Sequence, residues 1–270
     1  MDAFVKYADI CFKSFGDRVK HWITFNETVV FTALGYLVGA HPPGIKNDPK
    51  KYFQATHNVF TAHAKVVQNY KAMKQFGEIG ITHVFSPSFS IDDKEDNIMA
   101  TKHANQHGIN WFYDPVLKGE YPEYVVKQLS ENGWTPDWTE ELRIIKEAAE
   151  KNDFIGLNYY QPQRVMKNDV VVSNDEKSRE ACTGAPGNPS FDGVFKTVMM
   201  EDKVYTKWGW EIAPDAFLEG LRMLKNLYGD VKIYITENGL GDEDPIIEDE
   251  VVDVPRIKYI EEHLKALKEV

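Results

Sequence analysis

The sequence lacks any long apolar run and any basic tract. No stretch of about 18 consecutive apolar residues occurs in its 270 residues, so we expect no membrane-spanning helix. The segment after Met1 also lacks the basic start and apolar core of a signal peptide. Lysine and arginine are scattered and the formal net charge is −11, so neither nucleic acid nor an anionic membrane is expected as a partner.

Cysteine is nearly absent as well. Cys11 and Cys182 are far apart and belong to no CxxC or Cys/His spacing, so neither a disulfide framework nor a zinc site is predicted. This favours a reducing cytoplasm. There is no internal repeat or low-complexity tract, and the composition of 43% hydrophobic and 27% charged residues is ordinary for a globular protein. We expect a single domain over residues 1–270.

Strand-like and helix-like segments alternate along the chain. Runs of β-branched and aromatic residues predict strands over Val19–Phe25, Ile79–Phe85, Asp153–Tyr160 and Val231–Thr236. Apolar residues at helical spacing predict helices from Phe4 to about Gly16, then over Tyr52–Phe76, Asp96–Trp111, Glu123–Glu131, Thr139–Asn152 and Pro214–Tyr228, and a last one from Pro255 in which the chain ends. Residues 113–136 are otherwise expected to form loop, and residues 161–205 an excursion of short strand-like pieces.

Four strand-then-helix units predict an α/β fold with parallel strands and right-handed crossovers. Each expected strand is interpreted as ending in a candidate functional residue, an arrangement that (β/α)8 TIM barrels use, with the chemistry at the carboxyl ends of successive strands. Four units are half of such a barrel. The sequence therefore predicts an incomplete barrel, whose two edge strands would be open to pairing.

Two glutamates follow expected strand segments: Glu27, which comes after Asn26, and Glu237. Retaining glycoside hydrolysis needs one carboxylic acid to protonate the leaving oxygen and one carboxylate to attack the anomeric carbon, about 5 to 5.5 Å apart. Both glutamates are expected at the same face of the barrel. A glutamate after a strand is weak evidence by itself, because many carboxylates are simply exposed, so the surrounding motifs decide.

Those motifs resemble the acid/base and nucleophile motifs of glycoside hydrolase family 1. They are Trp22-Ile23-Thr24-Phe25-Asn26-Glu27 and Ile233-Tyr234-Ile235-Thr236-Glu237-Asn238-Gly239, in family order. Between them, Asp153–Tyr160 and Lys207–Ile212 resemble the family's sixth strand and its substrate-facing tryptophan segment. The resemblance covers essentially the whole chain and implies strands four to seven of the family's barrel.

The resemblance implies a role for each site residue. Glu27 would be the general acid/base and Glu237 the nucleophile. Asn26 would donate a hydrogen bond to the sugar 2-hydroxyl, Tyr160 would hydrogen-bond to the nucleophile, and Trp210 would form an aglycone-side platform. No cofactor and no metal is implied.

Plainer interpretations remain for several of these residues. Asn26 can simply end a strand, Tyr160 can be a satisfied core tyrosine, and Trp210 can be ordinary core. Two histidine pairs on expected helices suggest metal binding by their spacing, but no third ligand is clustered with either pair, so we predict packed or solvated side chains. These pairs are His57 with His63 and His103 with His107.

Within the family, three segments look most like bacterial 6-phospho-β-glucosidases: Thr183–Asp192, Tyr205–Trp210 and Glu237–Asp242. The implied substrate is a small β-glucoside or disaccharide phosphate. The family's phosphate-binding serine, lysine and tyrosine follow the eighth strand, beyond Val270, and its first three strands would precede Met1.

The leading hypothesis is a retaining β-glycosidase that cleaves 6-phospho-β-glucosides. Within enzymes, the alternatives are a β-glucosidase without phosphate specificity and a 6-phospho-β-galactosidase. From another class, the chain can be a catalytically inactive truncated fragment that forms homo-oligomers through its exposed strand edges.

Overall fold

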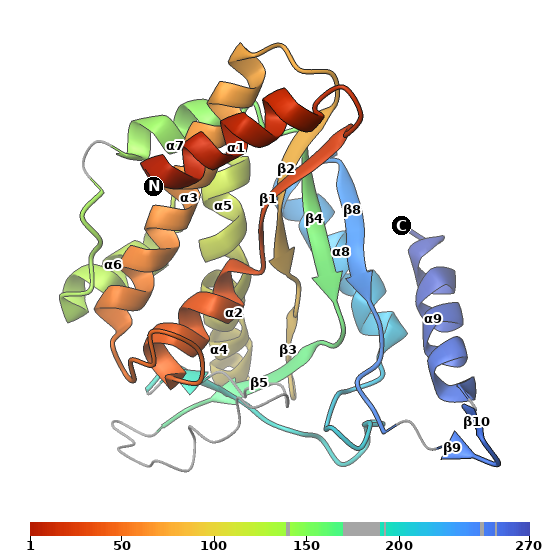
Figure 1. The fold of residues 1–270 in the computed structure, drawn as a ribbon. Helices are drawn as coiled ribbons and strands as arrows, with labels where there is room; N and C mark the ends of the chain where they lie inside the picture. Colours follow the sequence, from red (N-terminus) through yellow and green to blue (C-terminus); the bar gives the residue numbers. More distant parts are fainter. Residues whose placement is uncertain (139–140, 170–189, 192, 244–245, 252) are drawn as a thin grey trace. The chain divides into compact units, whose positions relative to one another are not determined.

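The computed structural model describes residues 1–138, 141–169, 190–191, 193–243, 246–251 and 253–270 (Figure 1). These residues form two compact units, which are considered separately. Unit 1 comprises Met1–Val84, Ile109–Asn158 and Val231–Thr236, and unit 2 comprises Phe85–Gly108, Tyr159–Asp230 and Glu237–Val270. The single domain expected over residues 1–270 stays a prediction.

Unit 1 is built on a four-stranded sheet with the strand order β1-β2-β4-β8. The strands are β1 (His21–Asn26), β2 (Glu78–Val84), β4 (Phe154–Tyr159) and β8 (Ile233–Asn238). β1, β2 and β4 run parallel, and the Ile155 N–H donates to the carbonyl of Lys232, which precedes β8, at 3.0 Å. The α/β class and the parallel sheet are confirmed.

Unit 1 also contains helices. They are α1 (Asp2–Phe15), α2 (Thr28–Ala33), the π-helix η1 (Leu34–Val38), α3 (Pro49–Ala72), α5 (Trp111–Leu117), α6 (Glu123–Asn132) and α7 (Glu141–Ala149). The buried ring of Phe12 on α1 packs edge-on against Trp22 of β1 and Tyr70 of α3, each with ring centroids 5.0 Å apart. α1 thus joins strand and helix in one apolar core.

Unit 2 holds a second, smaller sheet with the order β3-β5-β7-β6. Its strands are β3 (Ser88–Ser90), β5 (Gln163–Lys167), β6 (Ser190–Phe191) and β7 (Phe195–Thr197); the other elements are α4 (Glu95–Asn105), the π-helix η2 (Gln106–Asn110, reaching into unit 1), α8 (Pro214–Tyr228), β9 (Ile246–Ile247), β10 (Glu250–Val251) and α9 (Val254–Leu267). Ala100 and Ala104 of α4 share a small core with Val165 and Phe195. The excursion expected after Tyr160 therefore does contain short strands.

One predicted helix boundary is wrong. The helix expected to end at Trp111 passes through η2 and continues as α5 to Leu117, although Pro115 lies inside it. Trp111 and Tyr113 are fully buried there. Burial of these aromatic rings outweighs the local preference of proline for a helix end.

Two further predictions differ from the structure. β8 extends to Asn238, so Glu237 lies within the strand rather than after it. The last helix, α9, ends at Leu267 instead of running on to the end of the chain. Its buried positions are Tyr259, His263 and Ala266, whereas Ile257 and Leu264 of the predicted apolar stripe are 64% and 54% exposed.

The structure bears on the expectations about membrane-spanning helices and cysteines. In the described part of the chain, no helix is both long and apolar enough to cross a membrane. Cys11 is a free cysteine. Cys182 and the segment Thr183–Pro189, which carries part of the resemblance to 6-phospho-β-glucosidases, lie outside the described residues.

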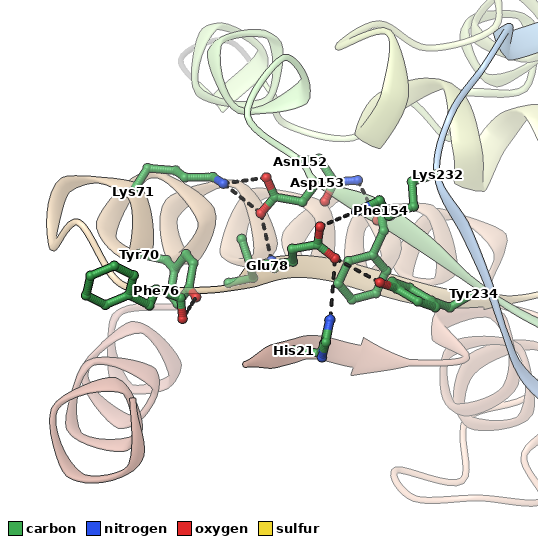
Figure 2. Close-up of polar contacts among 11 residues, drawn as sticks. His21, Tyr70, Lys71, Phe76, Glu78, Asn152, Asp153, Phe154, Lys232 and Tyr234 are labelled. Carbon is green, nitrogen blue, oxygen red and sulfur yellow. Dashed lines mark hydrogen bonds and ion pairs between the residues drawn. The ribbon is translucent and has the colours of Figure 1, made fainter. Parts of the chain in front are cut away.

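A charged network joins the beginnings of the strands of unit 1 (Figure 2). The Glu78 carboxylate on β2 accepts hydrogen bonds from Lys232 and from the Tyr234 hydroxyl of β8, the latter at 2.9 Å, and lies 3.6 Å from His21 Nε2 of β1. Lys232 and Tyr234, as donors to this carboxylate, hold the pKa of Glu78 below its ordinary value. Glu78 thus links β1, β2 and β8 at their amino-terminal ends.

A second carboxylate, Asp153, continues the network. It accepts hydrogen bonds from the Lys71 ammonium of α3 at 2.5 and 2.6 Å and from the Ile79 N–H at 2.8 Å (Figure 2). The ends of α3, β2 and β4 are therefore tied together. In barrel enzymes the amino-terminal ends of the strands contribute to stability rather than to chemistry.

We expect Glu78→Gln to weaken the dependence of the free energy of unfolding on pH in the acidic range. Because the pKa of Glu78 is lowered on folding, its contribution to stability is present above the ordinary pKa of a glutamate and is lost in the acidic range below it, as pH falls through the folded pKa. Urea unfolding across this range should show the difference between wild type and Glu78→Gln shrinking as pH falls. The control is Glu147→Gln, which breaks the exposed i,i+4 pair with Arg143 and should change little. Parallel profiles for wild type and Glu78→Gln would contradict this role.

Candidate active site

Glu27 has an unusual backbone conformation at the junction of β1 and α2. Its φ and ψ of 55° and 57° lie in the left-handed region, which non-glycine residues seldom adopt. Its N–H donates to the Thr82 carbonyl of β2 at 2.9 Å, so the turn is held by the neighbouring strand. Backbone strain of this kind is typical of functional positions, and the half-buried side chain of Glu27 is aimed by it.

Asn158, at the end of β4, holds both candidates on β1. Its completely buried amide donates to Asn26 Oδ1 at 3.0 Å and to Glu27 Oε1 at 2.9 Å. Its own oxygen accepts from the Thr236 hydroxyl of β8 at 2.6 Å. One amide therefore fixes the side chains of Asn26 and Glu27 against the ends of two other strands.

Asn158 is a functional candidate that the sequence interpretation missed. The available signal was a polar residue at the end of an otherwise apolar strand, Phe154-Ile155-Gly156-Leu157-Asn158. Gly156 makes room for the arrangement, since a Cβ atom there would lie only 2.0 Å from Thr82 Oγ1. Glycine at position 156 is thus required by close packing rather than by its backbone conformation.

In unit 2, Glu237 and Tyr160 are brought together. The Tyr160 hydroxyl donates a short hydrogen bond to Glu237 Oε2, as the resemblance implies, and both side chains are half-buried. A phenol donor orients a carboxylate and disperses its charge without neutralising it. Tyr160 is thus hydrogen-bonded to the candidate nucleophile, and its role at a sugar site stays a prediction.

Two further residues hold the backbone around this pair. The Asn238 amide donates to the Tyr159 carbonyl at 2.9 Å and to the Tyr259 hydroxyl at 3.2 Å. The Tyr259 hydroxyl donates in turn to the Tyr160 carbonyl at 2.7 Å. Burial raises the pKa of Tyr259, which keeps the phenol neutral as a donor. α9 thereby supports the residues beside Tyr160 and Glu237, a contact that periodicity could not predict.

Trp210 contacts Tyr160 in the same unit. The two ring centroids are 5.2 Å apart at 60°, and Trp208 meets Trp210 edge-on at 6.0 Å. Both indoles lie against Gly241, where an added Cβ would come within 2.8 to 3.0 Å of their rings. Trp210 is half-buried and Trp208 is 48% exposed, so they form a partly open aromatic surface beside Tyr160.

The predicted site residues thus fall into two groups. Asn26 and Glu27 belong to unit 1, together with Asn158, and Tyr160, Trp210 and Glu237 belong to unit 2. The first group can hold a carboxyl group ready to exchange a proton. The second presents an oriented carboxylate beside aromatic rings, an arrangement suited to nucleophilic attack at a sugar carbon.

The helical histidines His57 and His63 are packed, as predicted. Both are buried, with His57 Nδ1 2.8 Å from the Tyr121 hydroxyl and His63 Nδ1 2.8 Å from Thr24 Oγ1. Burial lowers the pKa of His57 to about 4 and that of His63 to about 3. Within the described residues, no group of three or more histidine, cysteine, aspartate or glutamate side chains is arranged to hold a metal ion.

Comparison with known proteins identifies relatives along the whole chain. The sequence model of Glycosyl hydrolase family 1 matches residues 1–270. A 6-phospho-β-galactosidase from Clostridium acetobutylicum is 36% identical over 99% of this chain and 57% of its own length. An aryl-phospho-β-D-glucosidase from Bacillus subtilis is 32% identical over 100% of this chain and 56% of its own.

A solved structure shows the same likeness. The crystal structure of a β-glucosidase from Exiguobacterium marinum matches with a TM-score of 0.83 and 33% identity, over 99% of this chain and 56% of that one. The chain thus spans about half the length of the relatives that it matches. Its fold is accordingly the incomplete barrel predicted from the sequence.

We expect two substitutions of Asn158 to distinguish the loss of its buried hydrogen bonds from the effect of an added charge. Asn158→Ala should lower the free energy of unfolding by about 1–3 kcal/mol at any pH, because it removes buried hydrogen bonds. Asn158→Asp places a second carboxyl beside Glu27, so one of the two must have a raised pKa. Its destabilisation should then grow as pH rises, since stability from a raised pKa is lost above that pKa.

Urea unfolding at pH 5 and pH 8 tests this. Asn158→Asp should be closer to wild type at pH 5 than at pH 8, with Asn158→Ala as the charge-free control. An equal loss for Asn158→Asp at both pH values would mean that the amide is not held against the Glu27 carboxylate.

Proposed function

The chain belongs to glycosyl hydrolase family 1, and on that premise we propose that the complete protein is a retaining β-glycosidase of 6-phospho-β-glucosides. The observation that carries the proposal is the Tyr160 hydroxyl donating to Glu237, because a carboxylate aimed by a phenol is what attack at an anomeric carbon needs. Glu27, held by Asn158 at 2.9 Å, supplies the second carboxyl group.

The proposed reaction is a double displacement. Glu237 attacks the anomeric carbon while Glu27 gives its proton to the leaving glycosidic oxygen, which departs with the aglycone. The glycosyl ester on Glu237 is then hydrolysed by a water molecule that loses its proton to Glu27. Both residues end in their starting forms, so no cofactor or metal enters the balance.

Neighbouring side chains support the two carboxyl groups. Asn26 accepts a hydrogen bond from Asn158 through its amide oxygen, so its NH2 group is directed away from Asn158 and suits donation to the sugar 2-hydroxyl. Such bonds strengthen in the oxocarbenium-like transition state. The partly open ring of Trp210 suits the apolar face of an aglycone.

Phosphate specificity is the finer part of the proposal. It is supported by the likeness of Tyr205–Trp210 and Glu237–Asp242 to 6-phospho-β-glucosidases, and by relatives named as phospho-β-glycosidases. The C. acetobutylicum relative keeps a 6-phospho-β-galactosidase as an alternative, and the E. marinum structure keeps a β-glucosidase. A phosphorylated substrate, which does not cross membranes unaided, would also fit a cytoplasmic enzyme.

A second candidate function is a catalytically inactive fragment that only self-associates. The apolar residues left exposed on the terminal helices favour it: Tyr7 and Ile10 on α1 are each 63% exposed, and Ile257 and Leu264 on α9 are 64% and 54% exposed. Apolar faces of this kind promote association. Because the chain spans about half of its relatives, activity is proposed for the complete protein.

We expect Glu237→Gln in the complete protein to abolish turnover of every glycoside. Glu27→Gln should slow the hydrolysis of substrates with poor leaving groups by about 100-fold or more. It should spare the first step for p-nitrophenyl glycosides, because their leaving group needs no proton. Steady-state and burst kinetics on both substrate types check this. An equal loss on both types in Glu27→Gln would refute its assignment as the acid.

A substrate panel tests phosphate and sugar preference. The panel consists of p-nitrophenyl β-glucoside and β-galactoside, each with and without a 6-phosphate. We expect the complete protein to hydrolyse the 6-phosphoglucoside faster than the other three. Preference for the galactoside phosphate or for an unphosphorylated sugar would select the corresponding alternative. Running the 270-residue chain in parallel, with sedimentation at several concentrations, separates an active assembly from an inactive self-associating one.

A further inference from the structure

A buried ion pair in unit 2 has no part in the proposed chemistry. Arg164, on β5, meets Glu211 through two nitrogens, with Nη2 to Oε1 at 2.6 Å and Nε to Oε2 at 3.0 Å. The side chains of Arg164 and Glu211 are only 16% and 3% exposed. Arg164 also lies over the ring of Phe89, 5.4 Å from its centroid, and its hydrogen bond to Glu211 raises the pKa of Arg164.

Stability alone is a weak explanation for such a pair. Moving two charges out of water is costly, and a buried ion pair frequently contributes no more than apolar residues of similar size would. What a bidentate pair does provide is a defined geometry, because the planar guanidinium and carboxylate match in only a few orientations. The question is therefore what the pair holds in place.

The answer lies in the residues next to Glu211. Residues 204–212 form a tight hairpin, in which the Thr206 N–H donates to the Trp210 carbonyl and the Ile212 N–H to the Val204 carbonyl, both at 2.9 Å. Thr206 Oγ1 also accepts from the N–H groups of Trp208 and Trp210, each at 3.2 Å. The hairpin is thus held by its own hydrogen bonds, and it carries both tryptophans.

Glu211 fastens this hairpin to the segment that follows Tyr160. Its carboxylate is bound by Arg164, and its backbone N–H donates to Gln161 Oε1 at 3.0 Å. Trp210 precedes Glu211, and its ring lies 5.2 Å from that of Tyr160. The ion pair therefore sets where the Trp210 ring lies relative to Tyr160, the residue that donates to Glu237.

We propose that Arg164 and Glu211 are a positioning pair for aglycone recognition, which place the Trp210 ring beside Tyr160 and Glu237. The inference rests on the proposed function, since it takes the aglycone of a β-glycoside as the group that Trp210 contacts. Neither Arg164 nor Glu211 touches the substrate. Their effect is on binding of the leaving part and not on the attacking carboxylate.

Loss of the pair should therefore affect substrates differently according to their leaving group. A 6-phospho-β-glucosyl fluoride has no aglycone ring for Trp210 to contact, whereas an aryl 6-phospho-β-glucoside has one. Loss of the pair should thus weaken the aryl substrate selectively. A general loss of folding would weaken both substrates alike.

The experiment uses the complete protein with two variants of the pair, Glu211→Gln and Arg164→Lys. Arg164→Lys keeps the positive charge but loses the planar, two-nitrogen contact with Glu211. The matched control is Lys167→Met, on the same strand, which breaks the more exposed contact with Asp96. For each variant of the pair we expect KM for the aryl glycoside to rise about tenfold. kcat/KM for the fluoride should stay within about threefold of wild type.

Several outcomes would overturn the inference. Equal losses on both substrates, or no loss on either, would mean that the pair does not position Trp210 for the aglycone. The same holds if Lys167→Met reproduces the effect. A wild-type protein that hydrolyses neither substrate would instead be a failure of the proposed function.

A spectroscopic readout keeps the two failures distinct. With 5-fluorotryptophan incorporated, the ¹⁹F resonance of Trp210 is assigned by its loss in Trp210→Phe. Glu211→Gln and Arg164→Lys should shift or broaden this resonance, while Lys167→Met should leave it in place. An unchanged resonance in both variants of the pair would refute the positioning role whether or not the protein is active.

Discussion

The buried amide of Asn158 is the contact on which the acid/base half of the site depends. Parallel strands bring their carboxyl ends to one edge of a sheet, and here β1, β4 and β8 carry polar side chains near these ends. One completely buried asparagine, Asn158, connects the three strands by donating to Asn26 and Glu27 and accepting from Thr236. The left-handed backbone of Glu27 is tolerated because its N–H also has a partner, the Thr82 carbonyl.

The two ends of the same sheet are held by different kinds of interaction. At the beginnings of the strands, full charges meet in the network around Glu78 and Asp153 (Figure 2). At the carboxyl ends, the neutral amide of Asn158 donates to the carboxyl group of Glu27 and accepts from the Thr236 hydroxyl. A neutral donor orients a carboxyl group without a strong pull on its proton, whereas a cationic partner would hold it ionised. The division suits a fold with its support at one end and its chemistry at the other.

Unit 2 supports the nucleophile candidate by a longer chain of contacts. Tyr259 of α9 and Asn238 of β8 hold the backbone at Tyr159 and Tyr160, and Tyr160 orients Glu237. On the other side, the Arg164–Glu211 pair fastens the hairpin that carries Trp210. Residues from a helix, two strands and a hairpin thus act on one carboxylate, although among these residues only Glu237, Tyr160 and Trp210 are expected to meet the substrate.

The sequence by itself determined the parallel α/β class, most helices and strands, and the candidates Glu27 and Glu237, because periodicity and short motifs are local properties of the chain. It could not determine that α5 continues through Pro115, since burial of Trp111 and Tyr113 is a tertiary effect. Nor could it determine the roles of Asn158, Tyr259 and Glu211, whose partners lie 131, 99 and 47 residues away. Spacing of this kind leaves no periodic signal, so only the tertiary structure decided which side chains hold the candidate carboxylates in place.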